Sequence, residues 1–173
     1  LNLHADDELV RVFETTGGDD IFVVSHSGQV MRFTEEQVRP MGRTAAGVRG
    51  MKLKVGDEVV SADCGRNDDA LLIVTDAGYA KRTQIAQFPR KNRGGQGVIG
   101  VKITSKKGKV VAAFMVGIED EIVAVASNGV TIRTAVRQIS SQGRAATGVR
   151  LMSIDEGQVV ASVAPILSTD DDE

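Results

Sequence analysis

The chain has 173 residues, of which 42% are hydrophobic and 25% are charged, a composition that is typical of a soluble globular protein and excludes a largely disordered one. Its apolar runs are too short to span a bilayer, and we expect neither a signal peptide nor a membrane partner. A single cysteine, Cys64, excludes an internal disulfide and indicates a reduced, cytoplasmic setting.

The formal net charge of −2 conceals an uneven distribution of charge. The stretch between Asp69 and Ala113 contains nine basic and two acidic residues, so its net charge is +7. Residues 20–63 are neutral, and residues 119–163 carry −1. Residues 170–173 are all acidic, so 168–173 is interpreted as an acidic tail, either a solvated terminus or a competitor for the basic middle.

One sequence pattern is repeated three times along the chain. In each copy an apolar run ends at a turn glycine, and these glycines are 50 and 51 residues apart. An arginine follows each glycine after four residues, a second arginine after fifteen, and a Gly-Val pair after nineteen. The turn glycines are Gly28, Gly78 and Gly129; the first arginines are Arg32, Arg82 and Arg133; the second are Arg43, Arg93 and Arg144; and the later glycines are Gly47, Gly97 and Gly148. Such regular spacing predicts a repeat architecture.

The repeats divide the chain into consecutive segments. Residues 1–15 are interpreted as the end of a preceding repeat, because Asp7-Glu8-Leu9-Val10 lies fifty residues before Asp57-Glu58-Val59-Val60. Repeat 1 then covers 16–66, repeat 2 covers 67–117 and repeat 3 covers 118–167, followed by the acidic tail.

Each repeat is expected to contain four β-strands. Short runs rich in Val and Ile, bounded by turn residues, are typical of strands, and Asn128-Gly129 is the strongest hairpin signal because both residues tolerate a positive φ. A third strand is expected to begin at each Gly-Val pair, and a fourth to run through pairs such as Val59-Val60. The pattern predicts an all-β, propeller-like array of four-stranded blades, with about three full repeats and part of a preceding one.

The most distinctive local sequence is the loop of residues 91–97, Lys-Asn-Arg-Gly-Gly-Gln-Gly. Its glycines let a backbone approach a partner closely and expose amide donors, while Lys91 and Arg93 supply positive charge. This combination suits the phosphate oxygens of a nucleic acid. The alternative is a flexible, solvated turn.

This loop resembles the gyrase A box, a Gln-basic-Arg-Gly-Gly-basic-Gly heptapeptide of the gyrase A/topoisomerase IV C-terminal repeat family. Arg93, Gly94, Gly95 and Gly97 match the box, whereas Lys91 replaces its glutamine and Asn92 and Gln96 replace basic residues. Three further motifs resemble repeats of the gyrase A domain: Tyr79-Ala80-Lys81-Arg82-Thr83, Arg39-Pro40-Met41-Gly42-Arg43 and Gly148-Val149-Arg150-Leu151-Met152.

The resemblance implies a β-pinwheel, a propeller-like disc whose neighbouring blades exchange strands. It implies binding and wrapping of duplex DNA around a basic rim, in support of negative supercoiling by a heterotetramer of gyrase A and gyrase B. The family's DNA-breaking tyrosine and metal-binding carboxylates lie elsewhere in the enzyme, so we expect no catalysis and no cofactor in this chain, and a cytoplasmic, nucleoid-associated location.

The repeat pattern leads to the same kind of partner. Arginines at fixed offsets in stacked repeats recur around the array and can follow a curved backbone without reading bases, and a 3% aromatic content disfavours single-strand binding. The leading candidates for DNA contact are Arg82, Arg90, Lys91, Arg93, Lys102 and Lys106 with the loop glycines Gly94, Gly95 and Gly97, and the weaker ones are Arg43 and Arg144. Arg32 and Arg133 are equally well explained as cross-strand partners of nearby acids.

Other patterns do not indicate an enzyme. Residues 95–100 match the dinucleotide-binding fingerprint as a string, but a β-rich segment follows where that motif requires a helix. His4 and His26 show no metal-ligand spacing with Cys64, and Tyr79 has no catalytic context. Two alternatives to a gyrase domain remain open, namely the C-terminal domain of topoisomerase IV and a propeller-type protein-interaction scaffold.

Overall fold

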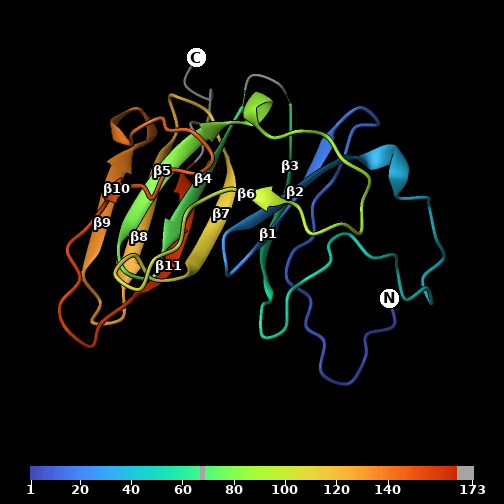
Figure 1. Cartoon of the computed structure of the whole chain (residues 1–173), viewed down its shortest axis with the longest axis horizontal. Coiled ribbons are helices and arrows are strands. Elements are labelled where there is room, and N and C mark those ends of the chain that lie inside the picture. The colour runs from blue at the N-terminus through green and yellow to red at the C-terminus, as the bar shows by residue number, and fades with distance from the viewer. Residues whose placement is uncertain (67–68, 167–173) are drawn as a thin grey trace, which may run out of the picture.

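The computed structural model describes residues 1–66 and 69–166 (Figure 1). The predicted acidic tail, 168–173, lies outside the described residues. The described part is almost entirely β-structure and forms three antiparallel sheets that stand side by side, which confirms the predicted array of β-blades. Its strands are β1 (Asp20–Ser25), β2 (Gln29–Thr34), β3 (Val59–Gly65), β4 (Ala70–Thr75), β5 (Tyr79–Gln84), β6 (Val98–Ile99), β7 (Val110–Val116), β8 (Glu121–Ala126), β9 (Thr131–Ala135), β10 (Val149–Arg150) and β11 (Val160–Ile166), and its short 3₁₀ helices are η1 (Glu35–Gln37), η2 (Ile85–Gln87) and η3 (Val136–Gln138).

Each blade begins with a tight hairpin. The turn glycines Gly28, Gly78 and Gly129 all have a φ between 80° and 87°, and each N–H donates back to the end of the preceding strand. The predicted hairpin at Asn128-Gly129 is confirmed, but only its glycine has a positive φ. The glycine therefore sits in the left-handed conformation that closes this kind of hairpin loop.

Strand exchange joins the blades. Blade 1 has the order β3-β1-β2-β6, blade 2 has β7-β4-β5-β10, and the described part of blade 3 has β11-β8-β9. Strand β6 comes from repeat 2 and β10 from repeat 3, so each strand that follows a Gly-Val glycine completes the sheet of the preceding repeat. In repeat 1 the corresponding residues, 47–49, form no strand.

The core lies between the blades. All six residues of β1 and of β4 are buried, because both faces of each strand are covered, whereas β8 alternates between buried and half-buried residues. One cluster, which includes Phe22, Leu71 and Phe88, joins blade 1 to blade 2. Another, which includes Leu72 and Ile122, joins blade 2 to blade 3. Apolar packing between neighbours thus stabilises each blade, as in other repeat arrays, and a further cluster around Met31 and Phe33 lies within blade 1.

The blades have distinct inner and outer edges. Strand β3 packs against β7, and β7 packs against β11, so these strands form the inner edge of the array. The exchanged strands β6 and β10 occupy the opposite ends of their sheets. We call the side of the array that carries β6 and β10 the outer edge.

Candidate nucleic-acid interface

Loop 91–97 leaves blade 2 after η2 and lies along the outer edge of blade 1. The Lys91 N–H donates to the Arg32 carbonyl oxygen at 2.9 Å, and the Gly94 N–H donates to the Gly50 carbonyl oxygen at 2.7 Å. The Gly95 carbonyl accepts a hydrogen bond from a backbone N–H of repeat 1 at 2.8 Å. The loop is therefore fixed to blade 1, which is inconsistent with a freely flexible turn.

The loop glycines have a structural role in this arrangement. Gly94 and Gly97 have φ values of +83° and +77°, which side chains rarely adopt. A Cβ atom on Gly97 would press against the Val30 carbonyl oxygen and lie 2.8 Å from its carbon. Gly97 therefore permits β6 to pair with β2, and the Gly94 amide is already occupied by a carbonyl inside the protein.

Arg93 holds the loop in place. Its Nε donates to the Gln37 carbonyl oxygen at 2.9 Å and its Nη1 to the Arg49 carbonyl oxygen at 3.1 Å, while its backbone N–H donates to Gln37 Oε1 at 2.9 Å. The side chain is half-buried, whereas that of Lys91 is exposed. Lys91 is thus the cation that the loop presents to solvent, and Arg93 positions it.

The first arginines of the repeats connect neighbouring elements. The Arg32 Nη1 donates to the carbonyl oxygens of Ile85 and Phe88 in blade 2, at 2.6 and 3.0 Å, and the Arg82 Nε donates to that of Ile139 in blade 3, at 2.8 Å. Arg82, a leading candidate for DNA contact, is half-buried and lies between two blades.

Two of these arginines form the expected cross-strand ion pairs. Arg32 pairs with Asp20, and both side chains are buried. Arg133 pairs with Glu121, and its side chain is exposed. The interpretation of Arg32 and Arg133 as partners of nearby acids is therefore confirmed.

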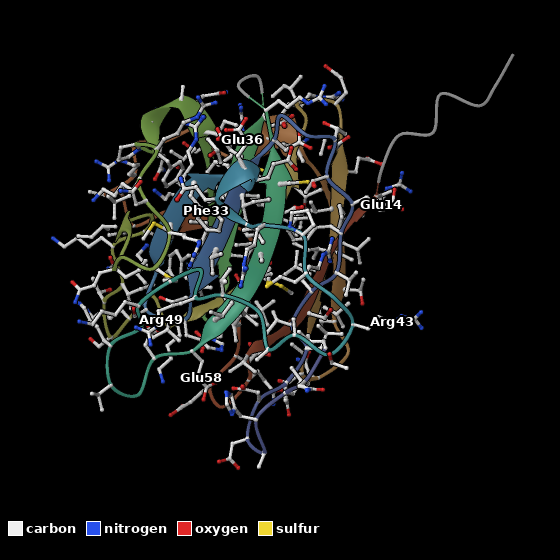
Figure 2. All side chains as sticks on the ribbon, turned by 90° about the vertical axis from the view of Figure 1, so that its right-hand side faces the viewer. Glu14, Phe33, Glu36, Arg43, Arg49 and Glu58 are labelled. Carbon is white, nitrogen blue, oxygen red and sulfur yellow. The ribbon has the colours of Figure 1, made fainter. Side chains whose placement is uncertain are left out.

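The remaining candidate arginines differ in their exposure and in whether the side chain already has a partner inside the protein. The Nε of Arg90 lies 2.9 Å from a carboxylate oxygen of the buried Asp20, so Arg90 also ties blade 2 to blade 1. Arg144 is half-buried and reaches the Ile99 carbonyl oxygen at 3.4 Å. Arg43 is exposed and points away from the fold (Figure 2).

Lys102 and Lys106 are both exposed and follow β6. The Lys102 backbone N–H donates to the Ala146 carbonyl oxygen at 3.1 Å. Ala146 belongs to residues 142–148, the segment of repeat 3 that corresponds to loop 91–97 and leads into β10. The hydrogen bond therefore joins the outer edges of blades 1 and 2 at Lys102.

Lys81 is a functional group that the sequence patterns did not single out. It is fully buried, and its Nζ donates to the carbonyl oxygens of Gly143 and Arg144 at 2.6 and 2.7 Å. Burial, with a smaller repulsion from Arg144, lowers the pKa of Lys81 to about 8. The signal was available in the repeat, because Lys81 occupies the position of Met31, which is also buried.

This lowered pKa predicts a pH-dependent stability. Between pH 8 and pH 10.5 the unfolded chain carries a proton on Lys81 that the folded chain lacks, so the free energy of unfolding must rise with pH. Relative to Lys81→Met, we expect the wild type to gain about 2–3 kcal/mol between pH 7.5 and pH 10. Urea unfolding followed by circular dichroism at several pH values measures this difference, and parallel pH profiles for the two proteins would contradict it.

Among residues 1–66 and 69–166 we find no helix with the length and hydropathy of a membrane span. Within 1–66 and 69–166 no group of three His, Cys, Asp or Glu side chains is arranged to hold a metal ion.

Comparison with known proteins identifies the family. The model of the family described as "DNA gyrase C-terminal domain, beta-propeller" matches residues 19–65, 69–116 and 120–166. The DNA gyrase A protein of Staphylococcus epidermidis is 43% identical over 173 residues, which cover 99% of this chain and 19% of that protein. The DNA gyrase A protein of Mycobacterium tuberculosis is 43% identical over 166 residues, which cover 95% of this chain and 20% of that protein.

Two solved structures share the fold. The crystal structure of the C-terminal domain of DNA topoisomerase IV superposes with a TM-score of 0.89 at 28% identity, and the match covers 95% of this chain and 52% of that one. A structure of the DNA gyrase A C-terminal domain gives a TM-score of 0.81 at 31% identity, with 88% and 52% of the two chains covered. Because the family model matches all three repeats and the relatives match almost the whole chain, the chain belongs to the DNA gyrase C-terminal domain family.

Proposed function

We propose that this domain binds duplex DNA along its outer edge and bends it, largely without reading the base sequence. The observation that carries the proposal is the hydrogen bond between Lys102 and Ala146, because it makes the outer edges of blades 1 and 2 continuous. Lys91 lies on one side of this junction and the segment that contains Arg144 lies on the other. Cations along such an edge can neutralise successive backbone phosphates.

The energetics require several contacts. Bending a site of 20–30 base pairs through tens of degrees costs on the order of 1–6 kcal/mol, so a single lysine cannot hold the bent duplex. Separate apolar clusters join blade 1 to blade 2 and blade 2 to blade 3, and this packing holds the cations of the array at defined positions. A row of charges that follows a curved edge favours a bent duplex, because only the bent duplex reaches all of them.

In the parent protein we assign the domain a role without catalysis or cofactor. The chain spans about a fifth of the length of the gyrase A relatives that it matches. Their name supports a parent that is an ATP-dependent type II topoisomerase, assembled with gyrase B, cytoplasmic and associated with the nucleoid. In that enzyme, DNA wrapped on this domain supports negative supercoiling.

The likeness to the solved topoisomerase IV domain favours a second candidate, in which the same DNA-binding surface serves a topoisomerase IV. Arg93, Gly94 and Gly95 of the box-like loop favour gyrase. A supercoiling assay distinguishes gyrase from topoisomerase IV. The parent protein is assembled with its ATP-hydrolysing partner and incubated with relaxed plasmid and ATP. Negative supercoils identify gyrase, and their absence identifies topoisomerase IV.

The DNA-binding proposal is tested with a duplex of about 40 base pairs labelled at both ends, titrated across a salt series. We expect affinity to fall steeply with salt and energy transfer between the ends to rise on binding. Lys91→Gln with Lys102→Gln is expected to reduce the slope of log K against log salt by about 1.8, because two phosphate contacts are lost. Lys91 and Lys102 are exposed, so this variant spares the contacts that Arg93 makes inside the protein.

A matched control removes the same charge elsewhere. Arg66 and Arg137 are exposed and pair with Asp19 and Glu119. Arg66→Gln with Arg137→Gln should leave the salt slope and the energy transfer unchanged. If the wild type binds DNA weakly and without salt dependence, the protein-interaction scaffold is the better description.

A further inference from the structure

Tyr79, Lys107 and Arg150 form a cluster on blade 2 that the proposed function does not yet use. Lys107 Nζ lies 3.4 Å from the centroid of the Tyr79 ring. Arg150 Nη2 donates to the Tyr79 hydroxyl oxygen at 3.1 Å, and Arg150 Cζ lies 5.5 Å from the ring centroid. Three separate segments supply these residues: the start of β5, the lysine-rich turn 105–109 and the end of β10.

The cluster holds two cations without neutralising them. Arg66, Arg90, Arg133 and Arg137 are paired with carboxylates, whereas among residues 1–66 and 69–166 neither Lys107 nor Arg150 forms an ion pair. An aromatic ring attracts a cation through its quadrupole and carries no net charge, so both positive charges remain available to an anion.

The Tyr79 hydroxyl adds a third donor. Because its oxygen accepts a hydrogen bond from Arg150, its own proton is free to be donated to another acceptor. An ammonium, a guanidinium and a phenol hydroxyl gathered around one ring suit an oxyanion with several acceptor oxygens, such as a backbone phosphate. Their contacts with the ring fix the side chains in advance, which lowers the entropy that is lost on binding.

The cluster lies on the outer edge, beyond the junction at Lys102. Arg150 is exposed at the end of the exchanged strand β10, and its register partner is Tyr79. The equivalent register pair in blade 1 is Gln29 with Ile99, which offers no charge. Asp76 is an acid that contacts turn 105–109. Its Oδ1 accepts a hydrogen bond from the Lys109 backbone N–H at 2.9 Å, not from Lys107. The cluster is thus a feature of blade 2, as the box-like loop is of blade 1.

We propose that Tyr79, Lys107 and Arg150 form a phosphate-contact site for duplex DNA, which holds the duplex on blade 2 after it passes loop 91–97. The site rests on the proposed function, because it binds the same duplex. It extends the DNA-contact surface from the edge of one blade to the edge of the next, and so increases the angle through which the domain can bend the duplex.

The test measures binding of the end-labelled duplex of about 40 base pairs across a salt series. Lys107→Gln with Arg150→Gln is expected to lower the affinity about tenfold, to reduce the salt slope by about 1.8 and to reduce the energy transfer. Tyr79→Phe keeps the ring and both charges, so it is expected to weaken binding about twofold to fivefold with an unchanged salt slope. The control is again Arg66→Gln with Arg137→Gln, and the urea midpoint of each variant establishes that it is folded.

Failure of this site and failure of the proposed function are distinguishable. If the Lys107 and Arg150 double variant binds like the control while the Lys91 and Lys102 double variant loses affinity, the phosphate site is overturned and the proposed function stands. If the folded wild type binds no duplex at all, both are overturned. Loss of affinity in both double variants with an unaffected control supports the site.

Discussion

Replacing Asp20 with asparagine is expected to lower the free energy of unfolding by about 3–5 kcal/mol. The Asp20 carboxylate is buried and lies between the buried Arg32 and the more exposed Arg90. The substitution removes the negative charge that pairs with both guanidiniums, so the buried ion pair with Arg32 and the more exposed one with Arg90 are lost together. Because Arg32 and Arg90 join blade 1 to blade 2, the loss falls on the interface between the blades.

Urea unfolding followed by far-ultraviolet circular dichroism measures this effect, since the chain contains no tryptophan. The matched control is Glu121→Gln, at the equivalent position of blade 3, where the partner Arg133 is 64% exposed. Solvent screens an exposed pair, so Glu121→Gln should leave the unfolding midpoint nearly unchanged. Equal midpoints for the two variants would show that the buried Asp20 ion pair contributes no more to stability than the exposed Glu121 pair.

Replacing Gly97 with alanine is expected to cost about 3 kcal/mol and to detach β6 from blade 1. The φ of +77° is strained for alanine, and the new Cβ would press on the Val30 backbone, which β2 holds in place. Detachment would also release loop 91–97, so the affinity for duplex DNA should fall together with stability. Loss of hydrogen-exchange protection at the Gly100 amide, which donates to the Gly28 carbonyl oxygen at 2.8 Å beside β6, would report the detachment directly.

Gly47 provides a control within the same repeat pattern. It corresponds to Gly97 in repeat 1 and has a φ of +83°, but a Cβ added to it would meet no atom within 4 Å. Gly47→Ala should therefore cost only the strain of its backbone conformation, about 1–2 kcal/mol. If the two alanine variants are equally stable, close approach to β2 is not what requires Gly97.

The hairpins and the periodicity of the array were determined by the sequence alone. A turn glycine between two apolar runs is a local signal, and the hairpin it closes involves residues only a few positions apart, so β1–β2, β4–β5 and β8–β9 were predictable. The arginine that follows each turn glycine was also visible, because the repeat places it at the same offset each time. These features need no knowledge of the neighbouring blade.

The partners of the charged residues were decided by the tertiary structure. The Gly-Val pairs indicate strands, but only the packing of whole blades shows that β6 joins β2, whose paired residues are about 70 positions apart in the chain. Lys81, Arg82 and Arg93 look like surface cations in the sequence, yet each donates to carbonyl oxygens of an adjacent repeat. A cation's availability to DNA depends on which acceptors the next blade brings to it, and that is a property of the assembled array rather than of any local pattern.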